Sequence, residues 1–416
     1  MPEIKQRIEQ IRRGEVPEGY VKERKVVIPQ QWGLPQIKDI ASISSGSTPN
    51  RNNSEYWNGN IAWVTTGELS SGHVNHTSEL ITVKAVKETK MRIYPQGTLL
   101  MAMYGQGKTR GTVAILEIDA AVNQACAAIT VKDGKSKFLF YQLKNSYQDI
   151  RKLSNTGNQE NLNADIIKTY QVPWAPDEEQ ERISTILTTQ DKVIELKGKR
   201  LAEKQRQKKY LMQQLLTGKK RLPGVNGAWK TDCLGKLFFE RKETNCENIE
   251  MLAITGTQGI IPRKELDLKD NSSEDKSKYL RVCVGDIGYN TMRMWQGVSA
   301  YSNYEGIVSP AYTILKPSSS INAKYFAYLF KMSEIVFLFY RFSQGLVDDT
   351  RNLKYENFKK IKACYPPDMK EQTAIAEVLS AADREIELLQ QDIEQEKQKK
   401  KALMQLLLTG IVRVKT

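Results

Sequence analysis

The stretch from Ala102 to Thr109 (AMYGQGKT) comes nearest to a nucleotide-binding motif, because it matches a relaxed phosphate-loop pattern with alanine in place of the first glycine. A phosphate loop runs from a strand into a helix, whose N-terminal amides hold the phosphate. Here the residues that follow, 110–118, have the pattern of a strand and not of a helix. The pattern therefore predicts a polar hairpin loop over residues 104–111. ATP hydrolysis that depends on Lys108 is left as an alternative.

No other group of residues has the spacing of a catalytic or metal site. Asp177 and Glu195 loosely match a metal-dependent nuclease, but those carboxylates need a sheet beside the ion, and these fall on a predicted turn and helix. His73 and His76 are the only histidines, and the five cysteines never occur as CxxC, which argues against a zinc knuckle or a disulfide framework. We therefore predict a cytoplasmic protein that is not an enzyme and needs no cofactor or metal.

The charge of the chain points to a polyanionic partner. The formal net charge is +14 and the isoelectric point is about 9.3. Lysine and arginine gain affinity for nucleic acid by displacing condensed counterions, although surplus lysines on solvated surfaces would give the same balance. No apolar run reaches the length of a membrane span, and the N-terminus (MPEIKQRIEQIRRG) has no apolar signal core. We expect double-stranded DNA as a partner and no membrane.

Several loops are rich in residues that read base edges or phosphates. Arginine pairs with guanine and asparagine or glutamine with adenine, whereas lysine, serine and threonine suit phosphates. Ordinary polar surface loops are the alternative explanation. The residues predicted to contact DNA in the first half of the chain are Ser47, Thr48, Asn50, Arg51, Thr66, Gln106, Lys108, Arg110, Asn158 and Gln159. Those predicted in the second half are Gln258, Arg263, Arg293, Gln296 and Arg351.

These loops are separated by an internal repeat. Residues 179–218 align with residues 371–410 without a gap, at a constant offset of 192, and both copies close with Leu-Leu-Thr-Gly. Neither copy contains proline, each follows a proline-containing turn, and each ends at a glycine, Gly218 or Gly410. The pattern predicts two long helices, each roughly 60 Å long at 1.5 Å per residue.

An apolar seam runs along both predicted helices. Apolar residues recur every three or four positions, which is what two helices need to interlock side by side. Glu396 and Lys400 interrupt the seam in the second copy. The seam residues of the first copy are Ile183, Leu187, Ile194, Leu201, Leu211 and Leu215. Those of the second copy are Ile375, Leu379, Ile386, Leu389, Ile393, Leu403 and Leu407. We predict that the two helices pair with each other as an antiparallel coiled coil.

The remainder of the chain forms two comparable blocks. Each begins near a tryptophan, Trp32 or Trp229, and continues with short β-rich runs and then a helical stretch. The predicted strands are 61–65, 97–104 and 112–118 in the first block, and 281–289 and 311–316 in the second. The predicted helical stretches are 138–153 and 322–343.

The fold class that follows is α+β, with two globular α/β domains joined by two long antiparallel coiled-coil helices and related by pseudo-two-fold symmetry. The predicted parts are an N-terminal helical segment (1–19), a first domain (20–176), a first long helix (177–220), a second domain (221–367) and a second long helix (368–416). The segment 197–221 is strongly basic, with Glu203 as its one acid, so it either lies along DNA or is a solvated helix face.

A set of short motifs relates both blocks to a known family. The first block contains Gly46-Ser47-Thr48-Pro49, YWNGNIAWVT (56–65), Gly67-Glu68-Leu69, GTLL (97–100), Asn123-Gln124, GNQENL (157–162) and PDEEQ (176–180). The second block contains VGDI (284–287), Pro366-Pro367-Asp368 and Glu371-Gln372, and its opening loop departs from the pattern. With these motifs the chain resembles the specificity subunit of a type I restriction–modification enzyme.

The resemblance implies a non-catalytic recognition subunit. Each of the two domains would be a target-recognition domain that reads one half of an asymmetric, bipartite DNA site. The paired helices would set the gap between the half-sites and dock two methyltransferase subunits, and restriction subunits would join that assembly. Adenine methylation and DNA cleavage would belong to those partners. A DNA-binding regulator or architectural protein that works alone remains the alternative.

Overall fold

The computed structural model describes residues 2–105, 107–153, 161–225, 227–246, 249–256, 259–266 and 275–414. By its internal contacts the chain divides into two compact units. Unit 1 comprises Met1–Leu196 and Ile393–Thr416, and unit 2 comprises Lys197–Asp392. Each unit therefore contains one of the two globular blocks together with part of each long helix.

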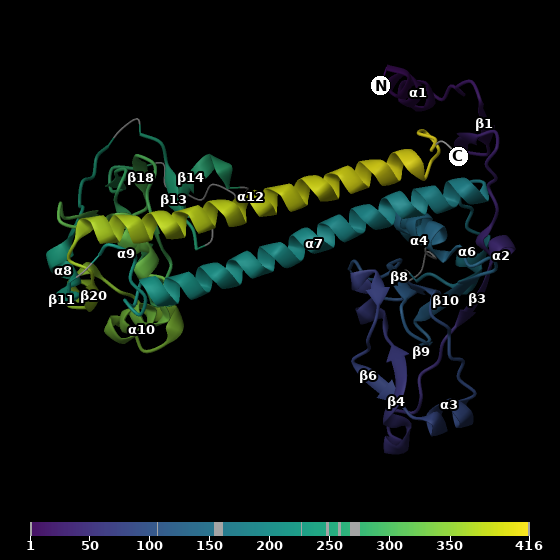
Figure 1. The fold of residues 1–416 in the computed structure, drawn as a ribbon, viewed down its shortest axis with the longest axis horizontal. Helices are drawn as coiled ribbons and strands as arrows, with labels where there is room; N and C mark the ends of the chain where they lie inside the picture. The colour runs from purple at the N-terminus through teal and green to yellow at the C-terminus, as the bar shows by residue number, and fades with distance from the viewer. Residues whose placement is uncertain are drawn as a thin grey trace. The chain divides into compact units, whose positions relative to one another are not determined.

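A five-stranded sheet lies at the centre of unit 1, in the order β3-β10-β7-β8-β5 (Figure 1). The strands in this sheet are Ala41–Ser45 (β3), His73–Val74 (β5), Leu99–Ala102 (β7), Val113–Leu116 (β8) and Cys126–Val131 (β10). All neighbours are antiparallel except β5, which runs parallel to β8. A second sheet has the order β6-β4-β9 and consists of Glu79–Ile81, Trp57–Val64 and Ala120–Val122. Strands β7, β8 and β9 are buried along their whole length, because their residues are apolar without interruption.

Helix α4 packs against the five-stranded sheet and against the long helices of unit 1. Phe138 and Leu139 of α4 belong to one core cluster with Leu99 of β7, Leu187 and Leu407. The other helical and hairpin elements of unit 1 are α1 (Pro2–Arg12), β1 (Tyr20–Glu23), β2 (Val26–Pro29), α2 (Ile37–Ile40), η1 (Ser54–Tyr56), η2 (Thr66–Ser71), α3 (Val83–Thr89), α4 (Ser136–Asn145), α5 (Tyr147–Lys152) and α6 (Ala164–Thr169).

Unit 2 is built around a four-stranded antiparallel sheet in the order β12-β19-β16-β17. The strands are Phe238–Glu240 (β12), Ile287–Asn290 (β16), Ser299–Tyr301 (β17) and Tyr312–Pro317 (β19). This order matches β3-β10-β7-β8 of unit 1, strand for strand. Three two-stranded sheets accompany it, formed by β11 (Lys230–Cys233) with β20 (Lys362–Tyr365), β13 (Leu252–Ile254) with β14 (Ile260–Pro262), and β15 (Leu280–Val282) with β18 (Gly306–Val308).

An aromatic core joins the sheet of unit 2 to its helices. Phe326, Phe330 and Phe339 pack with Phe238 of β12 and Tyr289 of β16. The helical elements of unit 2 are α8 (Leu234–Leu237), η3 (Arg263–Glu265), η4 (Met294–Gln296), α9 (Ala323–Leu329), α10 (Ser333–Phe342), η5 (Asp348–Thr350) and α11 (Tyr355–Phe358).

Four of the five predicted strands are confirmed and one is wrong. The runs 97–104 and 112–118 contain β7 and β8, and the runs 61–65 and 311–316 overlap β4 and β19. The run 281–289 is not one strand, because it divides between β15 and β16, which belong to different sheets. The chain turns between them at Gly285, whose φ is +96°. The carboxylate of Asp286 holds this turn by accepting hydrogen bonds from the Cys283 amide and from Arg241.

The two predicted long helices are confirmed as α7 (Asp177–Leu215) and α12 (Met369–Leu407). Gly218 and Gly410 follow them with φ of +69° and +71°, the left-handed conformation that ends a helix. In unit 1, Gln190 bonds to Glu396, and Asp191 bonds to Lys400. In unit 2, Lys197 pairs with Asp392 at 2.8 Å and Lys204 with Glu385 at 2.9 Å. Numbers rise along α7 as they fall along α12 and the residues that follow it, from Glu179–Arg413 to Gln190–Glu396 in unit 1 and from Lys197–Asp392 to Lys204–Glu385 in unit 2. The helices are therefore antiparallel within each unit (Figure 1).

The predicted seam residues divide into buried and half-buried positions. The buried ones are Ile183, Leu187, Leu215, Ile375, Leu379, Leu389, Ile393 and Leu407. The half-buried ones are Ile194, Leu201, Leu211, Ile386 and Leu403. The basic segment after residue 197 lies against acids of α12, so much of its charge is paired there. Among the described residues, no helix combines the length and apolarity that crossing a membrane requires.

A buried carboxylate fastens each globular block to the long helices. In unit 1, Glu179 accepts a hydrogen bond from the Trp32 indole at 2.8 Å and two from Arg413 at 2.7 and 2.8 Å. In unit 2, Glu371 accepts two from Arg221 at 2.5 and 2.7 Å. Both carboxylates are buried. Glu371 corresponds to Glu179 and Arg221 to Arg413, because the members of each of these pairs are 192 residues apart in the sequence. The two units are therefore stabilised by the same ion pair.

A tyrosine supplies a second repeated contact. Tyr141 of α4 donates a hydrogen bond to Asp191 at 2.8 Å, and Tyr328 of α9 donates one to Asp383 at 2.7 Å. Each of these aspartates also forms an ion pair with a lysine of the other long helix, Lys400 in unit 1 and Lys208 in unit 2. The helices thus hold each block in the same way.

Candidate nucleic-acid interface

One edge of the central sheet of unit 1 gathers loops from four parts of the chain. The last residue of β3, Ser45, lies opposite Ala127, and the last residue of β7, Ala102, lies opposite Cys126. Because the strands are antiparallel, the ends of β3 and β7 and the beginning of β10 share an edge. The loops 46–53, 103–112 and 123–125 leave the sheet there.

The loop after β4 reaches the same edge. Val64 lies beside Val122 in a parallel pair, and the Asn123 amide donates to the Val64 carbonyl at 2.9 Å. Thr66, which we predicted to contact DNA, is the first residue of η2, which follows β4. The Ser47 amide donates to the Val122 carbonyl at 3.0 Å, which brings the predicted residues Ser47 and Thr48 to this place as well.

Gln124 belongs to this group, although its exposed amide was not among the predicted contacts. Its side chain accepts a hydrogen bond from the Thr48 hydroxyl at 2.5 Å. Glutamine can read adenine in the major groove, so this position is a further candidate for base contact. Its presence in the Asn123-Gln124 motif was the sequence signal that could have identified it.

Arg51 lies on the same loop but is bound to other protein groups. Its guanidinium forms a bidentate ion pair with Glu79 and stacks over the indole of Trp57, with 4.2 Å from Cζ to the ring centroid. The guanidinium lowers the pKa of the Glu79 carboxyl. The neighbouring Asn50 is exposed, and its side-chain oxygen caps the amide of Asn52. Arg51 would therefore have to exchange partners to contact a base.

The loop after β7 is fastened to α5. Tyr147 donates to the Lys108 carbonyl at 2.6 Å, and Arg151 donates to the carbonyls of Arg110 and Gly107 at 2.7 and 2.8 Å. The Lys108 side chain is exposed, and β8 follows the loop, so no helix N-terminus is available there to hold a phosphate.

Arg110, also predicted to contact DNA, is buried in this structure. Its exposed fraction is 7%, so its side chain cannot contact DNA in this conformation. Burial follows from the way in which Arg151 draws the loop backbone against α5. Gln106, Asn158 and Gln159, also predicted as contacts, lie outside the described residues.

The equivalent edge of unit 2 carries most of the contacts predicted for the second half of the chain. Glu240, the last residue of β12, lies opposite Leu315, and Asn290, the last residue of β16, lies opposite Tyr312. Arg293 and Gln296 occupy the loop that follows β16, and both are exposed. Gln258 lies outside the described residues.

Two further predicted residues lie near this edge. Arg263 begins η3 after β14, and its positive charge partly offsets the burial that raises the pKa of Tyr312. Arg351 stacks over Tyr340, with 4.1 Å from Cζ to the ring centroid, and pairs with Asp348 at 3.4 Å. The loop of Arg351 is tied to the β16 loop, because the Leu353 amide donates to the Thr291 carbonyl at 2.9 Å.

Each unit has a lysine three residues after the tyrosine that bonds to the long helix. Lys331, three residues after Tyr328, donates to the carbonyls of Gly297 and Ser299 at 2.7 and 2.6 Å, directly after η4. Desolvation lowers the pKa of Lys331 to about 8, with a further contribution from Lys208. Lys144, three residues after Tyr141, also has a lowered pKa from burial, with a contribution from Lys400.

Comparison with known proteins identifies the family. A family model described as the type I restriction modification DNA specificity domain matches residues 29–206 and again residues 235–398. The chain belongs to the type I restriction–modification specificity family. Both matched regions contain one interface edge and most of one long helix, so the family pattern covers the features that the sequence and the fold repeat.

Similar curated proteins are also specificity subunits. The chain is 34% identical over 178 residues to the type I restriction enzyme MjaIX specificity subunit of Methanocaldococcus jannaschii, a match that spans 41% of this chain and 40% of that relative. It is 24% identical over 424 residues to the putative MjaX specificity subunit of the same organism, which covers 94% of this chain and 95% of the relative.

Solved structures of the family share the fold. The S subunit of the type I restriction–modification system from M. genitalium superposes with a TM-score of 0.58 and 14% identity, covering 93% of this chain and 98% of that one. A chain from a study of complex assembly and conformational transition of the type I system gives a TM-score of 0.56, also at 14% identity, covering 92% and 99%. The predicted α+β fold class is therefore confirmed.

Proposed function

We propose that the chain is the DNA-recognition subunit of a type I restriction–modification complex and reads one half-site with each unit. The observation that carries this proposal is the repeated edge. In both units the candidate base-reading residues lie on loops at the same edge of the central sheet, and the two sheets share a strand order. The recognition domains would be residues 20–176 and 221–367. The shared scaffold and family membership support the assignment.

The target we propose is asymmetric. The scaffolds repeat, but the loops that they carry do not. Ser47, Thr48 and Gln124 gather at the edge in unit 1, whereas Arg293, Gln296 and Arg351 gather at the edge in unit 2. Because base edges are distinguished by the donors and acceptors that meet them, different side chains imply different bases. Each domain would thus specify its own short half-site.

The long helices would set the gap between the half-sites. Half-sites that are read from one side of DNA lie about one helical turn apart, roughly 34–36 Å. Helices α7 and α12 are each unbroken over 39 residues, and a continuous helix can hold two domains at a fixed distance. Deleting one heptad from each helix, so that their antiparallel pairing can re-form, should change the gap or abolish binding while the half-sites stay the same. Altered half-sites with an unchanged gap would contradict this role.

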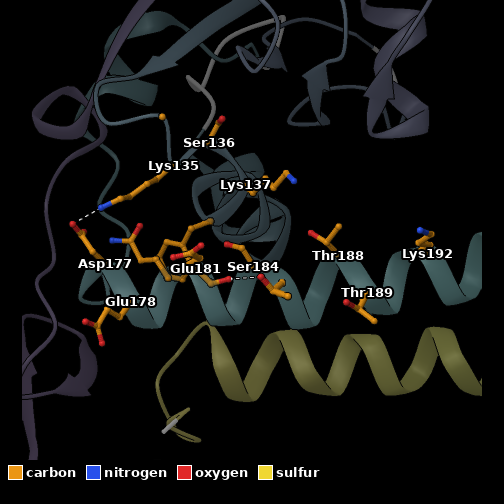
Figure 2. A pocket seen from close by; sticks show the side chains of 14 residues that line it. Lys135, Ser136, Lys137, Asp177, Glu178, Glu181, Ser184, Thr188, Thr189 and Lys192 are labelled. Atoms are coloured by element: carbon orange, nitrogen blue, oxygen red, sulfur yellow. Dashed lines mark hydrogen bonds and ion pairs between the residues drawn. The ribbon is translucent and has the colours of Figure 1, made fainter. Parts of the chain in front are cut away.

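A groove in unit 1 is a candidate surface for a methyltransferase subunit. It has a volume of about 820 Å³ and lies between the start of α4 and the first turns of α7 (Figure 2). Hydroxyl groups of Ser184, Thr188 and Thr189 line it, between the basic Lys137 and Lys192 and the acidic Glu181. A surface that combines apolar atoms with charges of both signs suits a protein partner.

The catalytic steps would lie in the partners. We propose that two methyltransferase subunits transfer the methyl group to adenine, that restriction subunits cleave DNA, and that this chain contributes recognition alone. The complex would work in the cytoplasm, where cellular DNA is accessible to it.

The test is a genome-wide map of methylated adenines in cells that express the neighbouring methyltransferase, with and without this chain. A motif of two unlike halves around a fixed gap, methylated only when the chain is present, would support the proposal. Unchanged methylation, with both proteins folded and associated, would contradict it. Tight and specific DNA binding by the chain alone, together with altered transcription, would favour a regulator instead.

A further inference from the structure

Apolar side chains project into solvent at the interface edge of unit 2. Leu346 is 99% exposed and Val347 is 59% exposed, both at the tip of the loop 344–352. Met292, on the loop after β16, is 38% exposed. A single exposed apolar residue is ordinary on a protein surface, but a group of them around a candidate binding site calls for a partner that covers it.

The loop that carries Leu346 is held in one conformation. The amide of Gln344 donates to the carbonyl of Asn352 at 2.8 Å, and the amide of Asn352 donates to the carbonyl of Gln344 at 2.7 Å. Gly345 has a φ of +127°, and a Cβ there would lie 2.6 Å from the Thr350 carbonyl oxygen. The backbone of this closed loop therefore requires glycine, and its geometry places the two following side chains outside the core.

The same loop is joined to the residues that we propose to read DNA. The Leu353 amide bonds to the Thr291 carbonyl at 2.9 Å, so the loop lies against the loop of Arg293 and Gln296. The indole of Trp295 donates to the Met292 carbonyl at 2.9 Å and packs edge-on against Tyr340. The apolar side chains and the polar candidates thus lie on two loops that are joined to each other.

The charges of the loop favour a base edge over a phosphate. Asp348 and Asp349 follow the apolar tip and are exposed. Carboxylates at this position would be repelled by the phosphate backbone, whereas on a groove floor they can accept a hydrogen bond from the cytosine amino group. A loop with an apolar tip beside two acids is therefore suited to the interior of the major groove.

Thymine is the base whose major-groove edge carries a methyl group. We infer that Leu346, Val347 and Met292 contact thymine methyl groups in the half-site read by unit 2, an inference that rests on the proposed function. The exposed apolar side chains would gain by burying those methyl groups, and the arginines and glutamine beside them would read neighbouring bases.

The experiment replaces thymine by deoxyuridine, one position at a time, in the bipartite site found by the methylation map. Deoxyuridine removes the methyl group and keeps the base pairing. Dissociation constants would be measured for the chain in complex with its methyltransferase partner. Burial of one methyl-sized group corresponds to roughly fourfold in affinity, so at least one substitution in the second half-site should weaken binding about fourfold.

Substitutions in the protein assign the effect to the loop. Leu346→Ala and Val347→Ala should each weaken binding to thymine-containing DNA by several-fold, and in Leu346→Ala the penalty for the matching deoxyuridine should largely disappear. The matched control is Val284→Ala. Val284 is 63% exposed and precedes β16, at the end of that strand opposite to the interface loop, so its replacement should leave binding unchanged.

The outcomes separate this inference from the proposed function. A half-site of unit 2 without thymine would overturn the inference, as would a deoxyuridine penalty of the same size in the wild type and in Leu346→Ala. Loss of the methyltransferase subunit from Leu346→Ala, with DNA affinity of the remaining complex unchanged, would assign the patch to a protein partner instead. A wild-type complex that binds no specific DNA would contradict the proposed function itself.

Discussion

The interface edges of units 1 and 2 use the same scaffold for different surfaces. The edge in unit 1 is polar, with Thr48 bonded to Gln124 and Lys108 exposed on a loop held by α5. The edge in unit 2 combines arginines with the exposed Met292 and Leu346. Beneath both edges, the strand order and the contacts to the long helices agree.

The comparison shows which contacts preserve the fold and which are open to variation. The Glu–Arg pairs and the Asp–Lys pairs occur in both units at the repeat offset, and in each unit a tyrosine of the block also bonds to the aspartate. These contacts hold a block to a helix pair whose geometry is the same in each unit. The interface loops lie beyond the last hydrogen-bonded residues of their strands, so they can change without disturbing the sheet. The candidate interface loops are therefore positions at which the two units can differ.

The largest expected effect comes from removing the buried glutamate of either repeated Glu–Arg ion pair. Glu179→Ala and Glu371→Ala each leave a partly buried arginine without its partner, which should lower the free energy of unfolding by about 2–3 kcal/mol. The loss should be greater for Glu179→Ala, because Trp32 also loses its acceptor. Urea unfolding gives the size, and hydrogen exchange shows which unit loses protection.

The matched controls are the exposed neighbours Glu178→Ala and Glu377→Ala, for which a change within about 0.5 kcal/mol is expected. If Glu179→Ala behaved like Glu178→Ala, the fastening would not stabilise unit 1, and the equivalence of the two units would be only geometric.

A smaller effect is expected where the two edges differ. Arg293→Ala should weaken specific binding by about 1–3 kcal/mol and relax selection at one position of the second half-site, as loss of a base-reading arginine does. Lys108→Ala should weaken binding to all sequences alike. It should also reduce the slope of the logarithm of the binding constant against the logarithm of salt concentration by about one, as loss of a phosphate contact does. Titrations of the methyltransferase complex at several salt concentrations distinguish the two.

If Arg293→Ala weakened binding to all sequences equally, Arg293 would contact the phosphate backbone of DNA and not a base. The apolar contacts of unit 2 would then be the remaining candidates for base readout on that side, which would sharpen the difference between the two edges.

The smallest effect concerns Lys331 and its pH dependence. The folded pKa of about 8 lies below the ordinary value of 10.5, so between these pH values the unfolded chain binds more protons than the folded chain. The stability of the wild type should therefore rise relative to Lys331→Met as the pH increases from about 8 towards 10, and the difference should be constant below pH 7. Urea midpoints of both proteins at pH 7 and pH 9.5 measure this change.

Lys144→Met tests whether unit 1 behaves in the same way, since the pKa of Lys144 is also lowered by burial. If the stability of the wild type relative to Lys331→Met fell as the pH rose, the ammonium would gain more from its carbonyl partners than it loses by desolvation.

Local sequence was sufficient to predict the long helices and the strands β4, β7, β8 and β19. Their signals are periodic and contained in neighbouring residues: an apolar seam, prolines before each helix and Gly218 or Gly410 after it, and apolar runs for β7, β8 and β19. The offset of 192 likewise predicted the repetition without any spatial information. The choice of polar loops as the interface also came from residue types, and the structure gathers the described ones at two sheet edges.

Tertiary structure decided the features that depend on residues distant in sequence. The apolar character of residues 281–289 predicted one strand, but the bond of Asp286 to Arg241 and the turn at Gly285 divide it between two sheets. Arg110 is buried because Arg151 holds its loop, and Gln124 meets Thr48 because β9 and β10 bring it to the edge of β3. Burial and pairing of this kind arise from contacts across the chain, so a linear pattern of residue types does not contain them.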